Sequence, residues 1–184
     1  MASLPPATAL HLAAGFLAGE AETVGDWAEG EGVSTPIALA LWESAVQPLA
    51  LRWGLALWGA PVSLWHRNAC PVCASSPTFA RIDGDNLRHL HCGLCGTSWP
   101  FQRLSCIWCT NTDPNQLQAW TEPSWDPWRV DTCRQCGGYW RTLDQRHGGL
   151  MGLKTGDLLS QVIRTRHLDV WAEQQGYYQG GRVA

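Results

Sequence analysis

Residues 87–109 read LRHLHCGLCGTSWPFQRLSCIWC, a segment in which two pairs of cysteines are each separated by two residues. A two-residue spacer lets both sulfur atoms of a tight turn face the same metal ion, and two such turns complete a tetrahedral site. All eight cysteines of the chain lie in pairs of this kind: Cys70/Cys73, Cys92/Cys95, Cys106/Cys109 and Cys133/Cys136. Eight thiolates therefore predict two tetrathiolate metal sites.

Two other uses of paired cysteines fit this sequence less well. A disulfide framework is typical of short secreted chains, and a bridge across two residues removes little conformational entropy from the unfolded chain. A thiol–disulfide exchange motif normally occurs once, at the start of a helix, whereas these four copies lie in loop-like sequence. The pattern therefore favours metal binding.

The spacing between pairs predicts how they combine. Between Cys73 and Cys92 lie 18 residues, within the range typical of zinc sites, and between Cys109 and Cys133 lie 23. Sequential pairing predicts a first rubredoxin-like or zinc-ribbon module at 66–104 and a second at 105–147. A crossed arrangement, first pair with third and second with fourth, stays open and leaves the ligand set unchanged.

Tetrahedral sulfur ligation suits both zinc and iron, so both metals remain open at each site. His89 and His91 lie just before Cys92 and are alternative ligands in principle. Because the cysteines already complete two sites, we expect both histidines to be strand side chains or to surround the site.

Residues next to the cysteines support tight turns. Pro71 presets a turn dihedral, and Gly96 and Gly137 follow the second cysteine of their pairs, where a positive φ lets backbone N–H groups point at sulfur. Ala74 and Thr110 hold the equivalent places in the other two pairs. We expect those two turns to be strained or differently shaped.

The composition argues against a nucleic-acid binder. The 184 residues include 13 basic and 16 acidic side chains, a net charge of −3, so no basic surface is indicated. A zinc-ribbon nucleic-acid module is the lesser alternative. Tryptophan occurs 12 times, and Trp120, Trp125 and Trp128 crowd one loop, either as filler of a small core or as a partner surface.

Residues 1–65 predict a helical region. A helix is expected from Ala7 to Ala18, followed by a loop at 25–34. The apolar segment 35–58 is interrupted by polar residues and by Pro48, so it predicts a soluble helix, or two meeting at Pro48, rather than a membrane span. Thr35 before Pro36 is a good helix start, with the hydroxyl as cap.

Short strands and turns are expected between the cysteine pairs. Residues 78–82 and 87–91 predict the arms of a hairpin with its turn at 83–86. In the second module, 117–120 and 128–131 predict two further strands within a connection rich in Pro, Asn and Asp.

Residues 148–184 predict a linker and a carboxy-terminal helix. The helix is expected from Thr155 to Gln175, with one apolar stripe and Gly176 as its terminator. The stripe consists of Leu159, Ile163 and Val170. The whole sequence thus predicts a small metal-stapled α+β fold, with the last helix packed on the modules or on the amino-terminal helices.

These motifs, in this order, resemble the formate dehydrogenase accessory proteins called FdhE. The resemblance covers about residues 60–178 and rests on CPVCASSP (70–77), LRHLHCGLCGTSW (87–99), Arg103 before CIWC, CRQCGGYWR (133–141) and LDVWAEQQGY (168–177). Ala74 replaces the family's usual glycine, and Asp157 is the only candidate for an acidic pair near the last helix. The amino-terminal region ahead of Cys70 is shorter than in typical members.

The resemblance implies a cytoplasmic accessory protein with two rubredoxin-like modules, which binds the catalytic subunit of a formate dehydrogenase or similar cofactor-containing oxidoreductase before assembly or export. It implies no enzymatic activity, and the sequence has no paired nucleophile and base and no phosphate-binding glycine loop. With eight thiols reserved for metal, the cytoplasm is the expected compartment. A rubredoxin-like electron-transfer or thiol-relay protein is the alternative.

Overall fold

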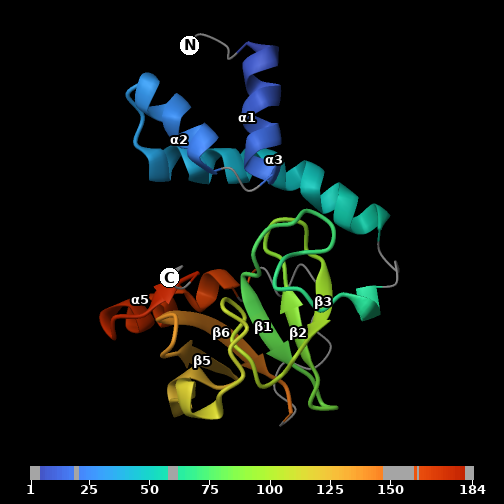
Figure 1. Cartoon of the computed structure of the whole chain (residues 1–184), viewed down its shortest axis with the longest axis vertical. Helices are drawn as coiled ribbons and strands as arrows, with labels where there is room; N and C mark the ends of the chain where they lie inside the picture. The colour runs from blue at the N-terminus through green and yellow to red at the C-terminus, as the bar shows by residue number, and fades with distance from the viewer. Residues whose placement is uncertain (1–4, 19–20, 58–61, 147–159, 161, 181–184) are drawn as a thin grey trace.

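The computed structural model describes residues 5–18, 21–57, 62–146, 160 and 162–180 and combines a helical part with a twisted sheet (Figure 1). This architecture confirms the predicted mixed helix and sheet class. The helices are α1 (Pro6–Ala18), α2 (Ala21–Gly30), α3 (Thr35–Ala56) and α5 (Arg166–Gln174), with short 3-10 turns at Val62–Leu64, Pro114–Gln116 and Pro123–Trp125. Helices α1–α3 lie together at one end of the molecule, whereas α5 lies against the sheet.

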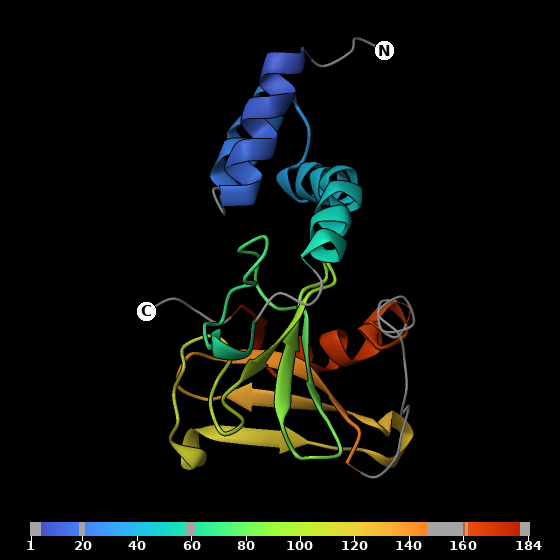
Figure 2. The ribbon, with the colours of Figure 1, turned by 90° about the vertical axis from the view of Figure 1, so that its right-hand side faces the viewer.

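The described residues form one seven-stranded sheet with the order β3-β2-β1-β6-β5-β4, and β7 pairs with β6. Its strands are β1 (Phe79–Ile82), β2 (Arg88–His91), β3 (Ser98–Phe101), β4 (Leu117–Trp120), β5 (Trp128–Cys133), β6 (Gly138–Asp144) and β7 (Tyr178–Gln179). Figure 2 shows how strongly this sheet twists between its two ends.

The predicted hairpin and the two further predicted strands are confirmed. Strands β1 and β2 form an antiparallel hairpin in which Ile82 faces Arg88, and β4 pairs antiparallel with β5. The pairing that joins them is parallel, with Ala80 of β1 opposite Thr142 of β6. The sheet therefore runs continuously through the two predicted modules, 66–104 and 105–147.

The amino-terminal region is helical, as predicted, but two of its boundaries differ from the prediction. Residues 25–30 belong to α2 and not to a loop, because the burial of Val24 and Ala28 against α3 outweighs the local preference of the glycines. Helix α3 continues through Pro48 as a single helix. Its N-cap is Ser34 and not Thr35, and no side chain caps it.

Helix α3 packs on the turn between β2 and β3. Gln47 donates a hydrogen bond of 3.0 Å from Nε2 to the carbonyl of Gly93. Gly54 lies so close to the carbonyl of Cys95 that a Cβ atom there would be 2.1 Å from the oxygen. The helical region is thus attached to the cysteine-bearing part of the sheet, while Leu41 and Leu55 on α3 remain exposed.

Helix α5 packs on β5, β6 and β7. It ends as predicted at Gly176, whose φ is +84°. The predicted apolar stripe is wrong where the structure describes it, because Ile163 and Val170 are 68% and 55% exposed, whereas Leu168 and Ala172 are buried. A turn at Thr165 separates the helical residues 162–164 from α5, so a stripe drawn on one continuous helix does not apply to both segments. Leu159, like residues 155–158, lies outside the described residues.

The tryptophans of the second module fill core space. Trp128 is buried, and the rings of Trp120 and Trp125 meet Trp171 of α5 edge to face at 5.5 Å and 5.0 Å between centroids. These contacts favour the filler interpretation over a partner surface. Among the described residues, no helix is long and apolar enough to span a membrane.

Candidate metal centres

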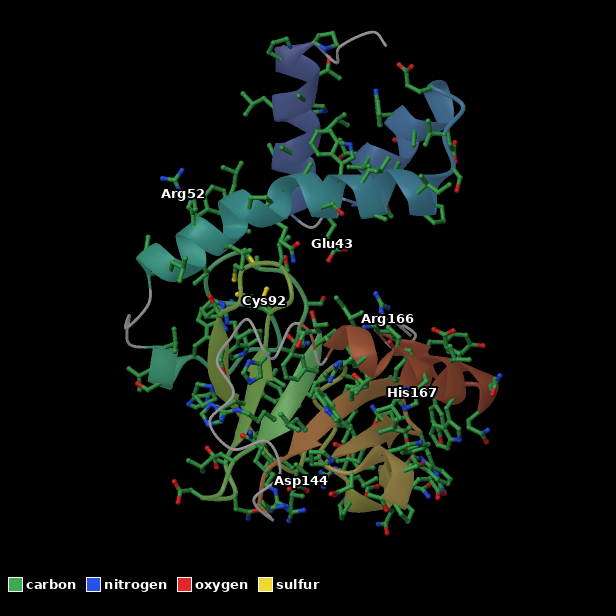
Figure 3. The ribbon with its side chains drawn as sticks, turned by 180° about the vertical axis from the view of Figure 1, so that it is seen from behind. Glu43, Arg52, Cys92, Asp144, Arg166 and His167 are labelled. Atoms are coloured by element: carbon green, nitrogen blue, oxygen red, sulfur yellow. The ribbon has the colours of Figure 1, made fainter. Side chains whose placement is uncertain are left out.

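The first two cysteine pairs meet in one tetrad. Cys70 and Cys73 come from a turn ahead of β1, and Cys92 and Cys95 from the turn between β2 and β3. The sulfur atoms of Cys70 and Cys95 are 3.4 Å apart, as are those of Cys73 and Cys92. Figure 3 shows Cys92 and its neighbouring sulfur atoms directly beneath α3.

The other two pairs form a second tetrad. Cys106 and Cys109 lie in a turn after β3, whereas Cys133 ends β5 and Cys136 lies in the turn between β5 and β6. The sulfur distances are 3.7 Å for Cys106–Cys136 and 3.8 Å for Cys109–Cys133. Grouping is therefore sequential, as predicted, and not crossed.

Both tetrads have the dimensions of a tetrahedral tetrathiolate site. An ion with metal–sulfur bonds of about 2.3 Å holds its sulfur ligands about 3.8 Å apart. In each tetrad the four sulfur atoms lie within 4.8 Å of one another, and all eight cysteines are free. Each tetrad could therefore hold one metal ion, and the sulfur set accepts zinc or iron.

The turns that carry the cysteines share one geometry. The backbone φ is +73° at Gly96, +58° at Ala74 and +59° at Thr110. In each case the N–H of that residue donates a hydrogen bond of 3.0 or 3.1 Å to the carbonyl of the first cysteine. The turns at Ala74 and Thr110 are thus strained, as one of the two expectations had it, and not differently shaped.

Backbone N–H groups point at the sulfur atoms. The N–H of Val72 lies 3.4 Å from the Cys70 sulfur, and the N–H of Trp108 lies 3.3 Å from that of Cys106. The hydroxyl of Thr97 is 3.1 Å from the sulfur of Cys95. Donors in these positions stabilise thiolates and tune a bound metal.

The two tetrads differ in exposure. All four sulfur-bearing residues of the first are buried, whereas Cys109 and Cys136 of the second are half-buried. Burial raises the pKa of the Cys136 thiol to about 11, while the hydrogen bond from Cys70 lowers the pKa of Cys95 to about 7. Four adjacent thiolates repel one another, so a cation is needed to hold all of them deprotonated.

The two histidines near Cys92 join neither tetrad. His89 Nε2 lies 3.0 Å from Asp83 Oδ2 at the end of the hairpin. His91 is buried and stacked on Phe79 at 4.6 Å between ring centroids, and its burial lowers its pKa to about 3. Both are strand side chains, as predicted.

Sequence reasoning missed Arg88, which connects the two tetrads. Its side chain is 4% exposed and donates to the carbonyl of Gln102 and, at 2.7 Å, to the carbonyl of Ser105, the residue before Cys106. The segment between the tetrads is thus held on β2. The signal in the sequence is weak, because Arg88 and His89 lie on opposite faces of a four-residue strand, and so short a strand does not show which face is buried.

Residues 69–103 match the family described as FdhE, central domain. This range carries all four cysteines of the first tetrad. The chain is FdhE-like. It is 32% identical over 117 residues to an FdhE homolog of Aquifex aeolicus, which is 61% of this chain and 40% of that relative. It is also 32% identical over 116 residues to an FdhE homolog of Proteus mirabilis, covering 61% of this chain and 36% of that one.

The FdhE likeness extends to the fold. The crystal structure of the FdhE protein from Pseudomonas aeruginosa superposes with a TM-score of 0.67 at 23% identity, over 97% of this chain and 58% of that chain. The helices and the sheet of this chain therefore have the same arrangement as the matching part of that FdhE structure. The FdhE-like matches span less than half the length of the two curated relatives.

Proposed function

We propose that this FdhE-like chain is a cytoplasmic accessory protein that binds the catalytic subunit of a formate dehydrogenase, or of a similar cofactor-containing oxidoreductase, before assembly or export. The observation that carries the proposal is the FdhE likeness of the region that forms the first tetrad. In this role the chain grips an immature client and catalyses no reaction itself.

The eight cysteines, in this proposal, ligate two metal ions that act structurally. Each ion joins two turns that are distant in the sequence, and the free energy of ligation then becomes folding free energy. A rigid surface binds a client at a lower entropic cost. The exposed apolar side chains of Leu41, Leu49 and Trp53 on α3 also support a protein partner over a small substrate.

The test is anaerobic capture of the tagged full chain co-expressed with a formate dehydrogenase catalytic subunit. We expect the subunit to be recovered with the chain, together with two metal ions per chain. The double variant Cys92→Ser/Cys95→Ser should lose metal, fold and client together, whereas Thr121→Ala, on an exposed loop, should lose none of them. Absence of the subunit from the capture would remove this client from the proposal.

A second candidate function is electron transfer or thiol relay, favoured by the half-buried Cys109 and Cys136. An iron ion in the second tetrad would lie near the surface, where an electron can pass to a partner. The test is the absorption spectrum of anaerobically purified chain with elemental analysis. A reversible change on oxidation that scales with iron content favours electron transfer, and a colourless, iron-free, zinc-loaded protein excludes electron transfer.

A further inference from the structure

A small cavity lies beside the second tetrad, next to Ser105 and Thr132, which directly precede Cys106 and Cys133. Its volume is about 150 Å³, and it is lined by side chains from β2, β4, β5 and β6 and from the segment 103–105. The residues that matter to its chemistry are Arg88, Arg103, Arg129, Asp131 and Trp140. Three arginines around one cavity are unusual, because guanidinium groups repel one another unless an anion lies between them.

Arg88 and Arg103 form no ion pair with a carboxylate among the described residues. Arg129 is paired with Asp131 at 3.0 Å and with Asp144 at 3.0 Å. Arg88 hydrogen-bonds only to Ser105 and to a backbone carbonyl, and Arg103 has no hydrogen bond or ion pair within the described part of the chain. The lining therefore carries three arginines and one carboxylate, that of Asp131, which pairs with Arg129 and also attracts Arg88, so positive groups outnumber negative ones.

Buried hydrogen-bond donors around the cavity also lack partners. Among the described residues, Nε of Arg88, Nε of Arg103 and the indole Nε1 of Trp140 are buried without an acceptor, and Arg88 and Trp140 are each 4% exposed. Asp131 accepts from Arg129 and, at 2.6 Å, from Thr142, and within the described chain it accepts from none of these three donors. Buried donors in native structures are satisfied in the great majority of cases.

The rest of the lining restricts the ligand. Leu104, Leu117 and Ala119 provide an apolar wall. A guanidinium fork binds the two oxygens of a carboxylate in parallel, and the aliphatic part of such a ligand would meet the apolar wall. The volume admits a molecule of only a few non-hydrogen atoms.

From this geometry we propose that the cavity binds a small aliphatic carboxylate, held by Arg88 and Arg103 and by the indole N–H of Trp140. The site uses no cysteine of either tetrad, and the proposal does not rest on the proposed client. Arg103 is half-buried, so it lies on the side of the cavity from which a ligand can enter from solvent. Arg88 is buried and held in place by its hydrogen bonds to Ser105.

The experiment is a titration of the metal-loaded full chain with sodium propionate, followed by the indole N–H resonance of Trp140 in NMR spectra and by calorimetry. The resonance is assigned by its loss in Trp140→Phe. We expect a saturable shift of this resonance. Arg103→Gln should weaken propionate binding by about tenfold or more, since a hydrogen bond to a charged group is lost, while Arg103→Lys should weaken it less.

Arg52→Gln is the matched control, because Arg52 is exposed on α3 and points away from the sheet (Figure 3). It should bind propionate like the parent chain, and metal content confirms that each variant is folded. Sodium chloride and inorganic phosphate at equal ionic strength serve as competing anions. The proposal is overturned if propionate leaves the Trp140 resonance unmoved, if Arg103→Gln and Arg52→Gln bind it equally, or if only phosphate binds.

Discussion

Ala74 and Thr110 show how the cysteine turns are constrained at the level of single residues. Both have a left-handed backbone, with φ of +58° and +59°, which Gly96 and Gly137 adopt without a Cβ penalty. The turns keep their shape because two cysteines of each must reach the same tetrad. The strained backbone of Ala74 and Thr110 is thus imposed by the geometry of the metal site and not by a preference of these residues for positive φ.

Ala74→Gly should stabilise the metal-loaded chain. The substitution relieves the left-handed strain of an exposed alanine, and the expected gain in the free energy of unfolding is about 1 kcal/mol. The measurement is urea unfolding at a fixed free zinc concentration. The reciprocal variant is Gly137→Ala, where φ is +68° and no atom lies within 4 Å of the added Cβ, and it should lose about 1 kcal/mol. Equal stability of both variants would contradict the strain argument.

At the level of elements, two contacts hold helices on the sheet. Helix α3 meets the first tetrad at Gly54, and α5 meets β6 through Arg141 and Asp169. The first contact depends on a glycine, which has no side chain, and the second depends on a buried ion pair. They therefore respond to substitution in different ways.

Gly54→Ala should displace α3 from the turn that carries Cys95. The new Cβ would lie 2.1 Å from a backbone oxygen that cannot move without disturbing the tetrad. We expect a loss of about 1–3 kcal/mol in the free energy of unfolding, as for other overpacked sites. Gly30→Ala is the control, because nothing lies within 4 Å of its Cβ in α2. Thermal unfolding of both variants tests the prediction, and a Gly54→Ala chain as stable as Gly30→Ala would refute it.

Asp169→Ala should detach α5. Arg141 Nε lies 3.0 Å from Asp169 Oδ1, and the Arg141 side chain is 1% exposed, so the variant leaves a buried charge without its counter-ion. The expected cost is about 3–5 kcal/mol. The double variant Arg141→Met/Asp169→Leu should recover much of it, because an apolar pair replaces the buried charges. The fluorescence of Trp171, which packs beside Trp120 and Trp125, would report the loss, and a double variant worse than the single one would argue against the ion pair.

At the scale of the whole molecule, the two tetrads belong to one structure. Cysteines of both lie in a single buried cluster with Leu90, Trp99 and Trp140. Strand β1, next to the first tetrad, pairs with β6, next to the second, and Arg88 holds the segment between them. Metal binding at one tetrad should therefore depend on the other.

Loss of the first tetrad should weaken metal binding by the second. In the variant Cys70→Ser/Cys73→Ser we expect clearly less than one metal ion per chain after gel filtration with a weak chelator, because the unfolded half of the sheet no longer supports β6. Elemental analysis measures the ratio. The variant Cys133→Ser/Cys136→Ser provides the reciprocal measurement. One full ion retained by either variant would mean that the tetrads are independent.

The sequence by itself determined that the eight cysteines make two tetrads, that residues 78–91 form the β1–β2 hairpin, that two further strands lie near 117–120 and 128–131, and that helices lie at both ends. These features depend on residues close in the chain, through the two-residue cysteine spacer and the alternation of side chains along a strand. Only the tertiary structure decided that β1 pairs with β6, that α2 continues to Gly30 and that α5 buries Leu168 in place of Val170. It also decided the burial of Arg88. These outcomes depend on contacts between segments far apart in the chain, and such contacts outweigh local propensity by the free energy of burying apolar surface.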